Sequence, residues 1–204
     1  MKNKIIKDAL ALTLITLVAG VALGVYEITK DPIARQEAQA KAEAYEQVFT
    51  DAAAFEEIEM DDTLIQTIRD QLDQEGYKAQ SIEEVMRAED QSGETLGYAF
   101  TVVTSEGYGG DIQFSMGVQN DGTLNGISIL SIGETAGLGM NADTPAFKDQ
   151  FVGKQVEKLQ YTKNGATQDD EINAISGATV TTNAMTNGVN AGLCAFRVME
   201  GGDQ

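Results

Sequence analysis

The sequence predicts an α+β protein: a single N-terminal transmembrane helix followed by a soluble domain with an antiparallel sheet and flanking helices. Residues 9–26 form an uncharged apolar run, short β-prone runs follow one another in the middle of the chain, and apolar residues recur at helical spacing near the C-terminus. We divide the chain into four parts: an N-terminus at 1–8, a transmembrane helix at 9–26, a stalk helix and connector at 27–62, and the soluble domain at 63–204.

The N-terminal segment from Ala9 to Tyr26 holds 18 residues without a charge. As a helix rising about 1.5 Å per residue it reaches roughly 27 Å, enough to cross the hydrocarbon core of a bilayer. The alternative is a cleavable signal peptide, with lysines before the run and small residues at 20–22. We favour the membrane anchor, because the run is longer than a usual signal-peptide core and ends in a residue that favours the membrane interface.

The charges around this segment predict its orientation. Lys2, Lys4 and Lys7 precede the span, whereas the cations that follow it are interspersed with carboxylates. By the positive-inside rule, residues 1–8 are cytoplasmic and the soluble domain is extracytoplasmic. We therefore expect a single-pass protein of the cell membrane.

The composition excludes several classes of function. With 32 acidic and 14 basic residues the chain carries a formal charge of −18, which repels nucleic acid. The sequence has no histidine, so His-based catalysis and His-ligated metals are excluded, and its one cysteine, Cys194, cannot hold an iron–sulfur cluster. We expect no metal site, and any redox chemistry requires an organic cofactor.

Helices are predicted at both ends of the soluble part. Pro32 stands at the tolerated first turn of a helix over 33–48, which is rich in Ala, Glu and Gln and only weakly amphipathic, as in a stalk. Apolar residues at helical spacing predict a helix over 63–72. A short helix is expected over 145–151, and a final helix over 182–199 places Met185, Val189, Leu193 and Phe196 on one face.

The strands form the middle of the predicted domain. Turn-forming residues separate the β-prone runs, and the Asp121-Gly122 pair is a strong hairpin signal. We therefore predict an antiparallel meander from the runs at 82–88, 96–104, 112–118 and 124–132. A further strand is expected at 156–162 and a strand-like run at 172–175. The acidic run at 56–62 lacks the ligand spacing of a calcium loop and is predicted to be a solvated connector.

The stretch before the last helix reads DEINAISGATVTT over residues 170–182. Threonine hydroxyls cap helices, and free N–H groups at the positive end of the helix dipole bind anions. On spacing alone this stretch is a helix cap of a common kind. Its candidate site residues are Ser176, Gly177, Ala178, Thr179, Thr181 and Thr182.

These residues also resemble a known family. Residues 176–179 match the SGAT signature of FMN-binding domains, in which a flavin transferase esterifies the threonine hydroxyl to the FMN phosphate. The chain resembles the G subunit of the Rnf electron-transport complex, a relative of NqrC in the sodium-pumping NADH:quinone reductase. The resemblance implies that residues 63–204 are the FMN-binding domain and that Thr179 carries covalently bound FMN, with Thr181 and Thr182 as its neighbours.

Two further stretches carry the resemblance. Residues 134–139 (ETAGLG) resemble the family's ETPGLG loop, with Ala136 in place of proline, and residues 107–110 resemble its GYGG turn. The family usually has Asp three residues before the Ser of SGAT, where this chain has Asn173. These stretches add to the implied flavin-binding residues Glu134, Thr135, Gly137, Leu138, Gly139, Tyr108, Gly109 and Gly110.

The resemblance implies that the chain carries electrons through its cofactor and has no catalytic residues of its own. It implies an electron-carrying subunit of a membrane-bound, ion-translocating ferredoxin:NAD oxidoreductase complex. The implied partners are the other membrane subunits and the flavin transferase. The alternatives are an NqrC-like component of a sodium-translocating NADH:quinone reductase, a free-standing flavoprotein, and a tethered non-redox binding or assembly module in which SGATVTT is only a helix cap.

Overall fold

The computed structural model describes residue 32 and residues 34–201. The predicted transmembrane helix at 9–26 lies outside these residues. Within them, no helix combines the length and the apolar character that a membrane span requires. Residues 41–204 group into one compact unit, and the fold below is that of its described part.

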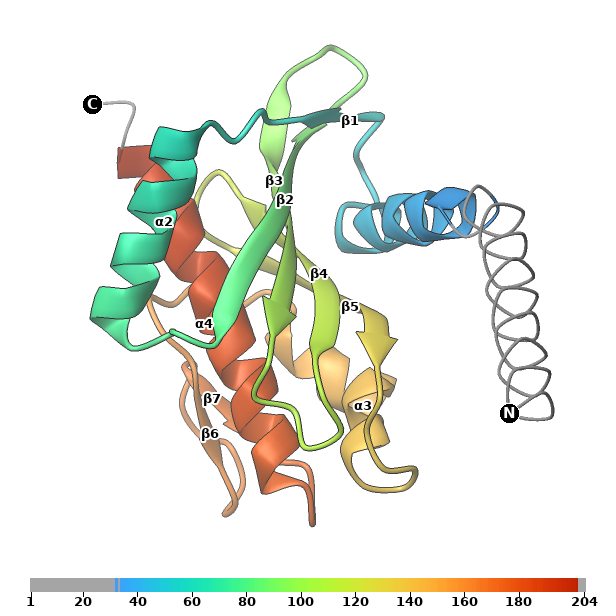
Figure 1. Cartoon of the computed structure of the whole chain (residues 1–204), viewed down its shortest axis with the longest axis vertical. Coiled ribbons are helices and arrows are strands. Elements are labelled where there is room, and N and C mark those ends of the chain that lie inside the picture. Colours follow the sequence, from blue (N-terminus) through green and yellow to red (C-terminus); the bar gives the residue numbers. More distant parts are fainter. Residues whose placement is uncertain (1–31, 33, 202–204) are drawn as a thin grey trace, which may run out of the picture. The chain divides into compact units, whose positions relative to one another are not determined.

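A five-stranded antiparallel sheet forms the centre of this unit (Figure 1). Its strands lie in chain order, so the predicted meander is confirmed. One strand was missed: β1 is four residues long and lies where the sequence predicted a connector. The strands are β1 (Ala54–Glu57), β2 (Gln80–Glu89), β3 (Thr95–Thr104), β4 (Ile112–Gln119) and β5 (Leu124–Ile132).

Two helices, α2 (Asp62–Glu75) and α4 (Thr179–Gly201), pack together on one face of the sheet (Figure 1). The side chain of Asp61 caps α2 by accepting a hydrogen bond from the N–H of Leu64 at 2.7 Å. Gly76 ends the helix with a φ of 90°. The main hydrophobic core lies between these helices and the strands. The helix predicted over 63–72 is therefore confirmed and slightly longer.

The opposite face of the sheet is covered by the end of the segment that was predicted as a stalk. Residues 34–48 are helical, as expected, but Tyr45, Val48 and Phe49 are buried against Ala88 and Ala99 of the sheet. This burial gives residues 41–49 a structural role in the domain that weak amphipathicity in the sequence did not predict.

Polar contacts fix the same helix to the sheet. The hydroxyl of Tyr45 lies 2.7 Å from Thr101 Oγ1 and donates to Glu84 Oε2 at 2.9 Å, and Lys41 pairs with the same carboxylate at 2.6 Å. Burial raises the pKa of Tyr45 above its usual value, so the hydroxyl stays a neutral donor.

The chain between β5 and α4 is mostly irregular. It contains η1 (Gly139–Asp143), α3 (Pro145–Lys148), η2 (Asp149–Phe151) and a small parallel pair, β6 (Gln160–Thr162) and β7 (Glu171–Asn173). The short helix predicted at 145–151 is present as α3 and η2. The strand predicted over 156–162 is wrong for its first half, because only β6 finds a partner strand. The strand-like run predicted at 172–175 overlaps β7 at residues 172–173 only.

We predict that Gly117→Ala destabilises the fold. A Cβ at this position would lie 2.7 Å from the carbonyl oxygen of Val48 and 3.0 Å from the ring of Phe49, so the helix end at 41–49 must shift. Overpacking of this kind costs about 1–3 kcal/mol of the free energy of unfolding, which urea denaturation measures. Gly201→Ala is the control, because a Cβ there meets nothing within 4 Å. Equal stability of the two variants would contradict the packing of this helix on the sheet.

Candidate functional site

The side chain of Glu134 joins the three stretches that the sequence singled out. Its Oε2 accepts a hydrogen bond from Thr181 Oγ1 at 3.0 Å, and its Oε1 accepts one from the N–H of Gly109 at 3.2 Å. The residue is 8% exposed. The carboxylate therefore connects the loop at 134–139 with the turn at 107–110 and with the first turn of α4.

Glycines allow these stretches to approach so closely. A Cβ on Gly139 would lie 2.6 Å from Thr181 Oγ1 and would also overlap the carboxylate of Glu134. A Cβ on Gly109 would overlap the backbone of Gly133, and one on Gly107 would lie 2.9 Å from Glu134 Oε1. The resemblance implied that Gly109 and Gly139 bind a flavin; what the structure shows is that they allow the segments of the site to pack against one another.

The three threonines at the start of α4 have different surroundings. Thr182 is fully buried, and its hydroxyl donates to the carbonyl of Ala178 at 2.9 Å and accepts from the N–H of Ile175 at 3.0 Å. Thr181 is 1% exposed and is bound to Glu134. Thr179 is partly exposed, and its hydroxyl has no hydrogen-bond partner among residues 34–201. Only Thr179 therefore presents a free, accessible oxygen.

The start of α4 differs from the predicted helix over 182–199. The helix begins at Thr179, so Thr181 and Thr182 lie inside its first turn. The hydroxyl of Thr182 connects the chain before the helix to its first turn, because it accepts from the N–H of Ile175 and donates to the carbonyl of Ala178. Among the described residues, no N–H of α4 donates to the hydroxyl of Thr179, Thr181 or Thr182, so these threonines do not have the capping role that the spacing predicted. Helix capping therefore leaves Thr179 unexplained.

Each of the three stretches has an exposed apolar side chain. Tyr108 is 75% exposed, Val180 is 50% exposed and Leu138 is 43% exposed. A Cβ on Gly177, whose φ is 75°, would lie 3.0 Å from Leu138 Cδ2, so the loop at 134–139 contacts the SGAT turn. The three side chains come from the three stretches that Glu134 joins, and those of Leu138 and Val180 provide exposed apolar surface close to Thr179 in the fold or the chain.

The remaining predicted residues contribute mainly backbone. The carbonyl of Thr135 accepts hydrogen bonds from the N–H groups of Leu138 and Met140, which closes the loop at 134–139. Gly110 has a φ of 120°, and no atom lies within 4 Å of a Cβ built there. The structure therefore brings the predicted stretches together, with some members supporting the site rather than lining it.

Sequence reasoning missed a second carboxylate that holds α4. Glu106, which follows β3, accepts hydrogen bonds from the side-chain amides of Asn183 at 3.2 Å and Asn187 at 2.7 Å. The two asparagines stand one helical turn apart, and this spacing is the signal in the sequence that could have indicated a shared partner. Glu106 and Glu134 thus fix the first three turns of α4 from the side of the strands.

Asn173 stands where the related signature usually has Asp. Its side-chain oxygen accepts from the N–H of Ala166 at 2.7 Å, while its side-chain nitrogen donates to Gln150 Oε1 at 3.0 Å. An amide can do both, whereas an ionised carboxylate has no proton to donate to Gln150. Asn173 therefore connects the loop after β6 to η2 in this chain.

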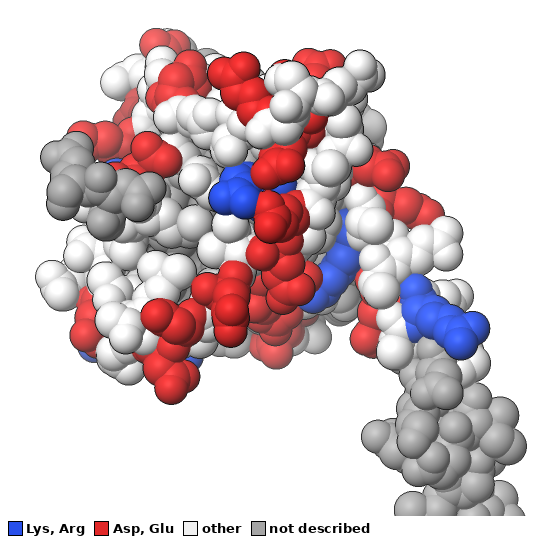
Figure 2. All heavy atoms as spheres, turned by 90° about the horizontal axis from the view of Figure 1, so that it is seen from above, with Lys and Arg blue, Asp and Glu red and all other residues white. Residues whose placement is uncertain are grey.

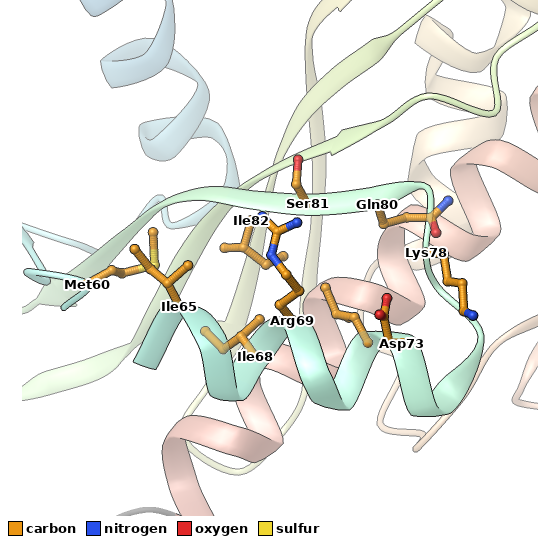
Figure 3. Close-up of a pocket in the computed structure, with 10 residues that line it drawn as sticks. Met60, Ile65, Ile68, Arg69, Asp73, Lys78, Gln80, Ser81 and Ile82 are labelled. Atoms are coloured by element: carbon orange, nitrogen blue, oxygen red, sulfur yellow. The ribbon is translucent and has the colours of Figure 1, made fainter. Parts of the chain in front are cut away.

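Other candidates lie away from this site. Cys194 is buried in α4, and burial raises the pKa of its thiol to about 12, which disfavours the reactive thiolate. A groove between α2 and β2 contains none of the predicted site residues, and its volume of about 50 Å³ is far below the roughly 300–1,000 Å³ of a small-molecule site (Figure 3). Among residues 34–201 no group of acidic residues and cysteine is placed to hold a metal ion.

Comparison with known proteins shows to which protein family the chain belongs. Residues 107–193, which include all three stretches, match the FMN-binding domain family, and residues 1–48 match the RnfG N-terminal region. The G subunit of the Na(+)-translocating ferredoxin:NAD(+) oxidoreductase complex of Acetobacterium woodii is 32% identical over 95% of this chain and 92% of its own length. The chain belongs to the family of the G subunits of ion-translocating oxidoreductase complexes.

Two further similarities were found. The G subunit of the ion-translocating oxidoreductase complex of Methanosarcina acetivorans is 28% identical over 98% of each chain. The crystal structure of NqrC from Shewanella oneidensis aligns with a TM-score of 0.49 at 21% identity, over 58% of this chain and 59% of that one.

The different surroundings of the threonines predict different effects on stability. Thr182→Val leaves the buried N–H of Ile175 without its acceptor, which costs about 1–3 kcal/mol of the free energy of unfolding. Thr179→Val removes no hydrogen bond within the described chain and changes this free energy by less than about 0.5 kcal/mol. Urea denaturation of protein produced without a flavin transferase measures both. A loss at Thr179 as large as that at Thr182 would show that Thr179 has a capping role.

Proposed function

We propose that this chain is the electron-carrying subunit of a membrane-bound, ion-translocating ferredoxin:NAD oxidoreductase complex of the Rnf type. In this proposal FMN is attached covalently by a phosphoester bond to the hydroxyl of Thr179. One observation carries the attachment site: of Thr179, Thr181 and Thr182, only Thr179 has an accessible hydroxyl without a partner in the described chain. Family membership supports the role in the complex.

The residues around Thr179 fit an FMN group. A phosphodiester keeps one negative charge, and the first N–H groups of α4 stabilise it by roughly 0.3–1 kcal/mol. Tyr108, Leu138 and Val180 provide exposed apolar surface for a flat aromatic ring. When bound, FMN supplies the electron-accepting and electron-donating chemistry, for which the chain has no group of its own.

The protein residues have separate tasks in this arrangement. Thr179 provides the ester oxygen, and the N-terminus of α4 stabilises the phosphate charge. Glu134 keeps the first turn of α4 next to the turn at 107–110, so that the apolar side chains and the attachment point remain in one place. The covalent bond retains an anionic group on a chain whose formal charge of −18 would repel a freely dissociating one.

The proposal includes the location and the partners. Residues 9–26 anchor the chain as a single span, residues 1–8 remain cytoplasmic, and the FMN-binding domain is extracytoplasmic. The uncharged run and the match of residues 1–48 to the N-terminal family region support this topology. The partners are the other membrane subunits of the complex, which supply the sites for ferredoxin and NAD, and a flavin transferase that attaches the FMN.

The attachment site is tested by flavin fluorescence in a denaturing gel. We expect the band of the chain co-produced with a flavin transferase to fluoresce under ultraviolet light, and Thr179→Val to abolish the signal because the ester oxygen is missing. Thr181→Val and Thr182→Val keep the accepting hydroxyl and retain fluorescence in the fraction that folds.

Two controls accompany the Thr179→Val measurement. Thr179→Ser restores a hydroxyl at the same position and should recover the fluorescence, and the band intensity by protein stain corrects for expression. Fluorescence that persists in Thr179→Val would move the attachment to another residue. No fluorescence in the unmodified sequence would contradict covalent attachment of FMN to this chain.

A further inference from the structure

The groove between α2 and β2 has an apolar floor and a charged rim (Figure 3). Ile65, which is 40% exposed, lies on the helix side, and Ile82 lies on the strand side. Arg69 extends from α2 toward β2 in Figure 3, and Lys78 follows the helix at one end of the groove. The groove is elongated along β2 and lies apart from the site at Thr179.

One edge of the sheet is open beside this groove. β1 pairs only with residues 86–89 of β2, and the N–H of Ile58 donates to the carbonyl of Val85 at 2.9 Å. From residue 80 to residue 84, no described strand pairs with the side of β2 that faces away from β3. An unpaired edge presents backbone N–H and C=O groups that can pair with an added strand.

The rim of the groove holds two cations, Arg69 and Lys78, and one carboxylate, Asp73. Lys41, Arg87, Lys148 and Arg197 each form an ion pair with a carboxylate. The side chains of Arg69 and Lys78 form no ion pair or hydrogen bond within the described residues, although acidic residues predominate on the surface seen in Figure 2. Arg69 and Lys78 outnumber the one carboxylate of the rim and lie in the same groove as the exposed side chain of Ile65, so the groove complements a segment that is apolar and carries a carboxylate.

We propose that this groove binds an extended segment of a neighbouring polypeptide, which adds as a strand to the edge of β2 at residues 80–84. Successive side chains of a strand point to opposite sides, so every second side chain of the segment lies on the floor at Ile65 and Ile82. A carboxylate of the segment binds Arg69 and Lys78. The groove volume of about 50 Å³ suits one or two side chains, and a bulge between Ile82 and Glu84 keeps the added strand short.

Site-specific cross-linking in the purified membrane complex tests which molecule occupies the groove. The photo-reactive residue p-benzoylphenylalanine replaces Ile65, and in a matched control it replaces Val152, an apolar residue that is 57% exposed and lies outside the groove. We expect position 65 to cross-link to one contiguous segment of a neighbouring subunit, and position 152 not to reach that segment. Cross-links from position 65 to lipid or to a second copy of this chain, or no cross-link at all, would overturn the proposal.

Hydrogen exchange tests the added strand itself. The outward-facing amides among residues 80–84 should exchange at least about tenfold more slowly in the complex than in the full chain purified alone, because they become hydrogen-bonded. Arg69→Glu combined with Lys78→Glu should remove this protection, whereas Lys163→Glu, an exposed lysine outside the groove, should retain it. Equal exchange in the complex and in the isolated chain would contradict strand addition. Covalent flavin fluorescence in each variant reports separately on the proposed function.

Discussion

The geometry of the site depends on the buried carboxylate of Glu134. It is the acceptor for a hydroxyl of α4 and for an N–H of the turn at 107–110, and it belongs to the loop at 134–139. Without this acceptor, Thr181 would leave a buried hydroxyl unpaired, and the side-chain hydrogen bonds that join the three segments would be lost. The glycines at 107, 109 and 139 leave the space that the carboxylate and its partners occupy.

This constraint separates structural from functional threonines. Thr181 and Thr182 are committed to internal hydrogen bonds, which orient the start of α4 against the strands. Thr179 precedes both and remains accessible at the end of the helix where an anion is stabilised. The same helix is fixed a turn later by Glu106, so the attachment point lies on a rigid element although the segments around it are loops.

The sequence predicted the features that follow from local periodicity. The meander followed from alternating runs and from Asp121-Gly122, and the segments of the site followed from the resemblance. The helix end at 41–49 was not predicted as a layer of the domain. Its burial depends on Gly97 and Gly117, two glycines far away in the sequence whose missing side chains leave room for the ring of Phe49. β1 was missed because its four residues form a strand only by pairing with β2. The bond between Glu134 and Thr181 joins residues that are 47 positions apart, a separation that local patterns do not report.

The most direct test of the attachment site is fragmentation mass spectrometry of the tryptic peptide from Asn164 to Arg197, which contains Thr179, Thr181 and Thr182. For protein co-produced with a flavin transferase, we expect this peptide to carry the mass of FMN less one water, and the fragment ions to place it on Thr179. The modification on Thr181 or Thr182, or a peptide without FMN, would contradict attachment at Thr179.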